Sequence, residues 1–166
     1  MKEQMMHVFE QRVLGIGMLF LLAILVGIKH AATGSILKDK PENNPWLWFV
    51  HVFNLFFLLV VNPAAAVVLT IRRMEAVDPT LLSLSASWLR SALEIGGIGL
   101  YIMGFLLMGW ALMSLRDNYQ AGGSNPRACD EMVLAGPYAL IRHPMYTGAL
   151  CISLGLAFMV QSLILF

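Results

Sequence analysis

The chain contains few charged residues for its length. Asp, Glu, Lys and Arg together make up 13% of its 166 residues, whereas hydrophobic residues make up 58%. A soluble domain carries about 25% charged residues, so this composition excludes an ordinary water-soluble protein and favours a lipid bilayer as the surrounding solvent. The length is sufficient for one compact bundle and not for two domains.

The chain also has almost no excess of positive or negative charge, and it contains only two cysteines. The formal net charge is +1, which gives no indication of a nucleic-acid partner or of a strongly basic protein of the membrane surface. Cys129 lies in a polar stretch and Cys151 in an apolar one, so we do not expect a disulfide, and two cysteines alone do not make a metal site. We therefore expect neither a metal nor a nucleic-acid partner.

The first apolar stretch lacks the marks of a cleaved signal peptide. Lys2 precedes it and Arg12 lies near its start, as in the basic start of such a peptide, but no small-x-small cleavage pattern follows Leu25–Ile28. The chain continues instead into Lys29 and His30, and three further apolar stretches follow. We interpret the first stretch as a retained membrane helix.

Four apolar stretches are long enough to cross a bilayer core of about 30 Å, which takes about 20 helical residues. They cover about residues 9–28, 46–70, 91–115 and 146–166. Hydrophobic and polar residues do not alternate in them, so helices and not a closed barrel are expected. The prediction is an all-α polytopic transmembrane bundle of four spans, with both termini on one side and a long polar loop before the fourth span on the other. Basic residues are nearly equal on the two sides and do not decide the orientation.

The second and third spans carry features that affect packing. Pro63 follows Asn62 within the second span and predicts a kink. The third span is rich in small residues, which allow a neighbouring helix to approach closely. The small residues in question are five glycines: Gly96, Gly97, Gly99, Gly104 and Gly109.

Polar residues within the spans allow two interpretations. His51 and Asn54 are three positions apart and lie on similar faces of a helix. Together with Asn62 they either form hydrogen bonds inside the bundle or line a path for a substrate. Glu94 follows Arg90 by four positions near the start of the third span, and this spacing predicts an ion pair at the membrane interface.

The loop of about thirty residues before the fourth span contains the most informative segment. In Leu134–Gly148 the pair Gly136-Pro137 predicts a sharp turn, and residues 138–141 are expected to form a short interfacial helix. Pro144 fits the first turn of the fourth span. An arginine, a histidine and two tyrosines would thereby gather at the start of one membrane helix.

The chemistry of this cluster suits an anionic or cationic small molecule. The N-terminus of a helix favours carboxylates and phosphates, and the guanidinium of Arg142 can hold a carboxylate through two hydrogen bonds. His143 can donate or accept a proton near neutral pH. The alternative is that both residues are ordinary interfacial anchors, as basic residues near the ends of membrane helices often are.

The order of these residues resembles the isoprenylcysteine carboxyl methyltransferase and phospholipid methyltransferase family of membrane enzymes. The family pattern is Gly-x-Tyr, a short spacer and Arg-His-Pro-x-Tyr-x-Gly at the start of a membrane helix. It stands here as Gly136-Pro-Tyr138 and Arg142-His-Pro-Met-Tyr146-Thr-Gly148. Residues 115–120 and 130–134 are also similar to the family, and the specific resemblance covers about residues 110–155.

The resemblance implies a single transmembrane methyltransferase-like domain over residues 1–166 that uses S-adenosylmethionine. Its acceptor would be lipophilic: an isoprenylcysteine carboxylate, a phospholipid or a small thiol. It further implies a multi-pass protein of the inner or cell membrane with the active-site loop on the cytoplasmic side. The implied catalytic residues are Arg142, His143 and Tyr146. The implied cofactor-binding residues are Gly136, Tyr138, His143, Pro144, Tyr146 and Gly148.

The chain departs from the family pattern at its end. Family members continue into another membrane helix and a polar segment that supplies a glutamate and an arginine, whereas this chain stops at Phe166. We therefore expect that a C-terminal part is lacking, and that a homo-oligomer or a completing segment is needed for full activity. Gly148 and Gly155, seven positions apart, are interpreted as the face on which such an additional helix would pack.

Two other functions are compatible with the motif. Membrane sterol reductases use a related Arg-His-x-x-Tyr-x-Gly pattern with NADPH, but they are normally much longer and carry further C-terminal motifs. A non-enzymatic membrane protein that retains the motif is the other alternative. The short chain and the His143-Pro144 pair favour the methyltransferase.

Overall fold

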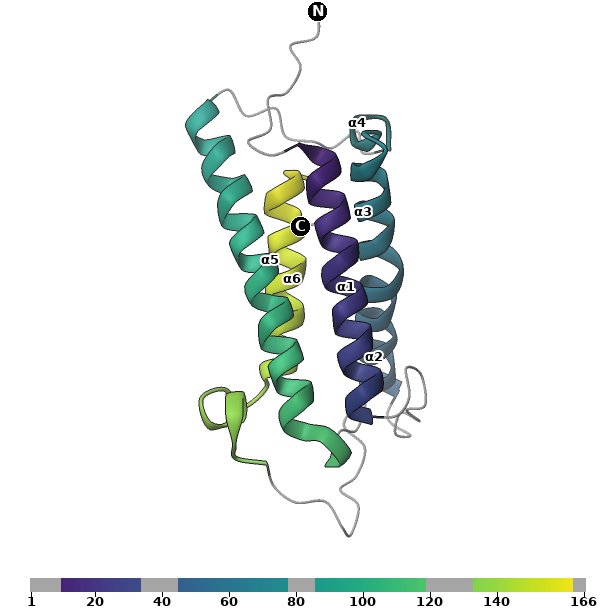
Figure 1. Cartoon of the computed structure of the whole chain (residues 1–166), viewed down its shortest axis with the longest axis vertical. Coiled ribbons are helices and arrows are strands. Elements are labelled where there is room, and N and C mark those ends of the chain that lie inside the picture. The colour runs from purple at the N-terminus through teal and green to yellow at the C-terminus, as the bar shows by residue number, and fades with distance from the viewer. Residues whose placement is uncertain (1–9, 34–44, 78–85, 119–132, 163–166) are drawn as a thin grey trace, which may run out of the picture.

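A computed structural model of the chain describes residues 10–33, 45–77, 86–118 and 133–162. The regular structure of these residues is helical, so the predicted all-α bundle is confirmed (Figure 1). The elements are α1 (Gln11–Thr33), α2 (Pro45–Phe56), the π-helical η1 (Phe57–Val61), α3 (Asn62–Thr70), α4 (Met74–Val77), α5 (Ser87–Leu115), the 3-10 turns η2 (Arg116–Asn118) and η4 (Gly136–Ala139), and α6 (Pro144–Val160).

The described residues contain three helical stretches that are long and apolar enough to cross a membrane. They are Gln11–Ala32, Val52–Thr70 and Ser87–Leu115, which overlap the first three predicted spans. In the fourth, α6 is an apolar helix of 17 residues that begins at Pro144 and is shorter than the others. Large apolar side chains point outward from the bundle, among them Phe20 and Leu106 at 66% exposure each. Such a surface suits hydrocarbon and not water.

The helices run alternately up and down, which separates two ends of the bundle (Figure 1). We call the end where α5 finishes and α6 begins the motif end, because η4 lies there. At the opposite end, α1 and α5 begin and α3 and α6 finish. An ion pair between Arg72 and Glu10 joins the end of α3 to the start of α1 there.

Glycines bring α5 and α6 into the most extensive contact in the bundle. A Cβ atom built on Gly104 would lie 2.7 Å from the carbonyl oxygen of Gly148, and one on Gly97 would lie 2.8 Å from that of Gly155. Both distances are too short for a side chain, so the two backbones approach each other at positions seven residues apart on each helix. The predicted role of small residues is confirmed for Gly97 and Gly104.

The partner of the Gly148 and Gly155 face was predicted wrongly. A Cβ atom on Gly155 would lie 2.5 Å from the amide nitrogen of Tyr101, and one on Gly148 would lie 2.9 Å from the carbonyl oxygen of Gly104. The face that was interpreted as a site for an additional helix is therefore occupied by α5. Sequence spacing shows that two glycines share a face of a helix, but it does not show which neighbour that face contacts.

Two other glycines of the same span, Gly96 and Gly99, face open space. Nothing lies within 4 Å of a Cβ atom built on Gly96 or Gly99, and the nearest neighbour at Gly109 is a flexible atom of Ile28 at 3.3 Å. On α1, Gly15 packs closely on α3, where the carbonyl oxygen of Ala66 would lie 2.4 Å from an added Cβ. Helix packing thus depends on a subset of the glycines.

The second predicted span is continuous but changes its winding before Pro63. Residues Phe57–Val61 are π-helical, and the amide of Asn62 donates to the carbonyl of Phe57, five positions earlier. Pro63 has no N–H to donate, and its ring would collide with a carbonyl of the preceding turn in a regular α-helix. The wider turn relieves this conflict, so the irregularity predicted at Pro63 takes the form of a π-helical segment.

Polar side chains inside the bundle link the helices. The hydroxyl of Tyr101 donates to Oδ1 of the fully buried Asn62 over 2.5 Å, which joins α5 to α3. Asn62 therefore forms the expected internal hydrogen bond, whereas the side chain of His51 lies outside the described residues. Glu94, which the spacing predicted to pair with Arg90, is fully buried within the bundle. The side-chain amide of Gln161 donates to the backbone carbonyl of Arg90, joining the end of α6 to α5.

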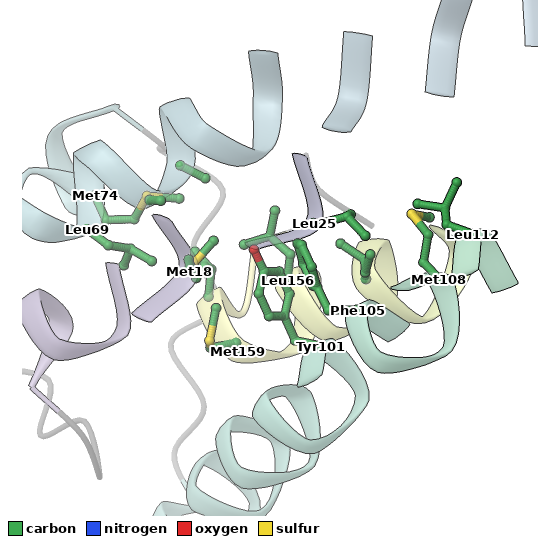
Figure 2. Close-up of a cluster of buried hydrophobic side chains, with 14 residues drawn as sticks. Met18, Leu25, Leu69, Met74, Tyr101, Phe105, Met108, Leu112, Leu156 and Met159 are labelled. Carbon is green, nitrogen blue, oxygen red and sulfur yellow. The ribbon is translucent and has the colours of Figure 1, made fainter. Parts of the chain in front are cut away.

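Apolar side chains from several helices fill the centre (Figure 2). Met18 comes from α1, Phe105 from α5 and Leu156 from α6, and each is at most 5% exposed. The rings of Tyr101 and Phe105 lie 4.9 Å apart within this cluster. The core thus fixes the position of α6 relative to α5, and with it the position of the motif.

Candidate functional site at the start of α6

The two halves of the motif lie at the same end of the bundle. The turn η4 packs on the C-terminal part of α5, and the chain then leads through residues 140–143 into α6 (Figure 1). The motif residues outside α6 therefore sit at one end of the apolar bundle. This is the placement that the sequence predicted for them.

The turn at Gly136 is fixed by its backbone and by its neighbours on α5. Gly136 has φ of +65°, which side chains rarely tolerate. A Cβ atom there would lie 2.3 Å from Oγ of Ser114 and 3.2 Å from Nε1 of Trp110. The next residue, Pro137, is fully buried, and its carbonyl accepts the amides of residues 140 and 141 at 3.1 and 2.9 Å. The short helix predicted at residues 138–141 is instead a single 3-10 turn that begins two residues earlier, Gly136–Ala139.

Tyr138 lies half-buried in this turn. Burial raises the pKa of its hydroxyl to about 12, because the phenolate would lose hydration there. The hydroxyl therefore stays protonated at neutral pH and can donate a hydrogen bond.

The start of α6 is built around His143 and Pro144. Pro144 occupies the first turn and is fully buried. The backbone carbonyl of His143 accepts both the amide and the hydroxyl of Thr147, at 3.0 and 3.1 Å. These bonds engage the backbone of His143 and leave its side chain exposed beside the helix.

Three motif side chains are open to a ligand at this helix start. Arg142 and His143 are exposed and Tyr146 is 50% exposed. The rings of His143 and Tyr146 lie 6.0 Å apart with a tilt of 57°. A cation, an imidazole and an aromatic ring are therefore exposed at the N-terminus of α6, whose first amides have no acceptor within the helix.

Gly148, in contrast, faces α5 and not the outside. Its contact with the backbone of Gly104 explains why a side chain is absent there. A direct approach of Gly148 to a cofactor stays a prediction, as do the roles of the other motif residues in binding and catalysis.

The side chains present suit S-adenosylmethionine by their chemistry. Arg142 and the first amides of α6 match a carboxylate, and the rings of Tyr146 and Tyr138 offer faces on which a sulfonium cation is favourable. Within the described part of the chain, no group of three or more His, Cys, Asp and Glu could hold a metal ion.

Sequence reasoning missed Trp110 and Ser114. They lie four positions apart at the end of α5, the spacing of residues on one helix face. That spacing alone gave no reason to connect them with Gly136, which is more than twenty positions further along the chain. Their contribution appears only where the turn folds back on α5.

Comparison with known families agrees with the motif. Residues 93–166 match the sequence model of the phospholipid methyltransferase family, a segment that includes most of α5, the turn η4 and α6. No curated protein sequence and no solved structure matches the chain. The resemblance drawn from the motif is thereby confirmed for this part of the chain, and it supports an integral membrane methyltransferase in general.

Proposed function

We propose that this protein transfers a methyl group from S-adenosylmethionine to a lipophilic acceptor at the motif end of the bundle. The observation that carries the proposal is the exposure of Arg142, His143 and Tyr146 at the N-terminus of α6, in the segment that matches the methyltransferase family. An apolar bundle that ends in a polar cluster suits a reaction between a water-soluble cofactor and an acceptor that stays in the bilayer.

Each exposed residue has a role that follows from its chemistry. Arg142 would hold the carboxylate of the cofactor. The imidazole of His143 and the ring of Tyr146 would line the same space, where an aromatic face stabilises a positive charge. The neutral hydroxyl of Tyr138 would donate a hydrogen bond from the η4 turn. The cofactor supplies an electrophilic methyl group, and the protein contributes alignment and exclusion of water.

The acceptor belongs to a chemical class and not to a single compound. An isoprenylcysteine carboxylate, a phospholipid amine and a small thiol all carry a nucleophile that can be methylated. Membership of a family does not fix the substrate. Methyl transfer from labelled S-adenosylmethionine to a panel of these three acceptors would identify the class, and absence of transfer to every one would contradict the proposal.

We expect that His143→Ala weakens binding of S-adenosylhomocysteine by about ten- to a hundredfold. The change would remove a hydrogen bond from the imidazole to a charged group of the cofactor, and such a bond contributes on the order of 1.5–3 kcal/mol. Titration calorimetry on the chain in lipid nanodiscs measures the affinity. His30→Ala is the matched control, because His30 is also exposed and lies in the last turn of α1 at the motif end. Binding that is unchanged by both His143→Ala and Tyr146→Ala would exclude this site.

We propose further that the loop before α6 faces the cytoplasm, as the family resemblance implies. A reporter inserted at Gly123 should then be cytoplasmic, and a reporter fused after Phe166 should lie on the other side of the membrane. Alkaline phosphatase and green fluorescent protein fusions distinguish the two sides. Both reporters on the same side would contradict the proposed topology.

A further inference from the structure

The last two turns of α5 contact the motif at a point where no side chain can be added. Trp110 and Ser114 lie four positions apart, and both meet the site of a Cβ atom on Gly136, at 3.2 Å from Nε1 and 2.3 Å from Oγ. The hydroxyl of Ser114 donates to the backbone carbonyl of Trp110 over 2.9 Å, which holds it in one rotamer. The surface against which the turn rests is therefore fixed by α5 itself.

Both halves of the motif thus take their position from the same helix. The turn η4 rests on Trp110 and Ser114, with the adjoining Pro137 fully buried. The start of α6 is held separately through the contact of Gly148 with Gly104. A shift of the turn on α5 would move Tyr138 relative to the start of α6 without disturbing the contact between the two long helices.

We propose that Trp110 and Ser114 are positioning residues of the cofactor site. They hold the Gly136–Ala139 turn so that Tyr138 faces the cofactor bound at the start of α6. This inference rests on the proposed function, and it adds residues of α5 that lie outside the Gly-x-Tyr and Arg-His-Pro patterns. Neither residue needs to touch the cofactor, because each acts through the turn.

The first test compares two tryptophans of α5. Trp110→Ala should weaken binding of S-adenosylhomocysteine to the full chain in nanodiscs by roughly tenfold. A change of this size lies within the range of interaction energies found between contacting residues. Trp88→Ala is the control, because Trp88 lies near the other end of the same helix and is 73% exposed, against 47% for Trp110. The thermal midpoint of the two variants should be similar. Trp110→Phe, which keeps most of the ring volume, should recover part of the affinity.

The second test separates a positioning role from a merely structural one. If Trp110 acts through the turn, Trp110→Ala should change the affinity by less than about twofold in a Tyr138→Ala background, because the side chain that it positions is gone. If the double variant instead loses affinity by the product of the two single effects, the inference is overturned. It is also overturned if Trp110→Ala and Trp88→Ala bind with equal affinity. A wild-type chain that does not bind S-adenosylhomocysteine would overturn the proposed function as well, so the two failures are distinguishable.

Discussion

Replacement of Gly104 by leucine is expected to separate α5 from α6 and to destabilise the bundle. A Cβ atom at this position would lie 2.7 Å from the backbone oxygen of Gly148 and 2.8 Å from the backbone nitrogen of Ile152. Backbone atoms cannot rotate away as the end of a flexible side chain can. Overpacking of an interior typically costs about 1–3 kcal/mol, and a clash with backbone should reach at least the upper part of that range.

Gly99→Leu provides the matched control for this change. Gly99 lies on the same helix, five positions earlier, and nothing lies within 4 Å of an added Cβ atom. Leucine also favours the helix over glycine by somewhat less than about 1 kcal/mol, so Gly99→Leu should be neutral or slightly stabilising. Unfolding in a mixed-detergent titration measures both variants. Equal unfolding free energies for Gly104→Leu and Gly99→Leu would show that the close contact of α5 and α6 does not exist.

Replacement of Gly136 by valine is expected to abolish cofactor binding while the bundle remains folded. The backbone there has φ of +65°, a conformation that is a genuine outlier for a β-branched residue. The added side chain would also collide with Ser114. The turn must therefore move away from α5 and take Tyr138 with it. Displacement of a positioned group by about 1 Å can lower a rate roughly a hundredfold, so methyl transfer should fall together with binding.

The effect should be confined to the site, because η4 is a single turn at the edge of the bundle. Ala139→Val is the control, since Ala139 is an exposed residue of the same turn. Binding of S-adenosylhomocysteine should be undetectable for Gly136→Val and close to wild type for Ala139→Val, with thermal midpoints within a few degrees of each other. Wild-type affinity of Gly136→Val would mean that the position of the turn does not matter for the site.

Local chemistry explains why the turn and the helix start could be predicted from sequence. Gly136 and Pro137 are suited to a tight turn by their backbone preferences, and Pro144 is suited to the first turn of a helix. Residues between them are few, so the chain has little freedom to separate Tyr138 from Arg142. The short connection therefore places both halves of the motif at one helix start in almost any fold.

The contacts between helices could not be predicted in this way. Gly97 and Gly99 are both glycines of the same apolar helix, yet one meets the backbone of α6 and the other faces open space. Their chemistry is identical and only their direction around the helix axis differs. Likewise, Glu94 lies near a helix end by sequence but is fully buried in the bundle, and the end of α6 reaches this part of α5 through the hydrogen bond of Gln161.

The sequence by itself determined that this protein is an all-α membrane bundle, and it placed a polar cluster at the start of the last helix. Both follow from local properties: the length of apolar stretches and the backbone preferences of glycine and proline. Only the tertiary structure decided that α5 contacts both halves of the motif, through Gly104 at α6 and through Trp110 and Ser114 at the turn. Such contacts join residues that are distant in the chain, and they depend on the rotation and height of each helix, which the packing of the whole core sets.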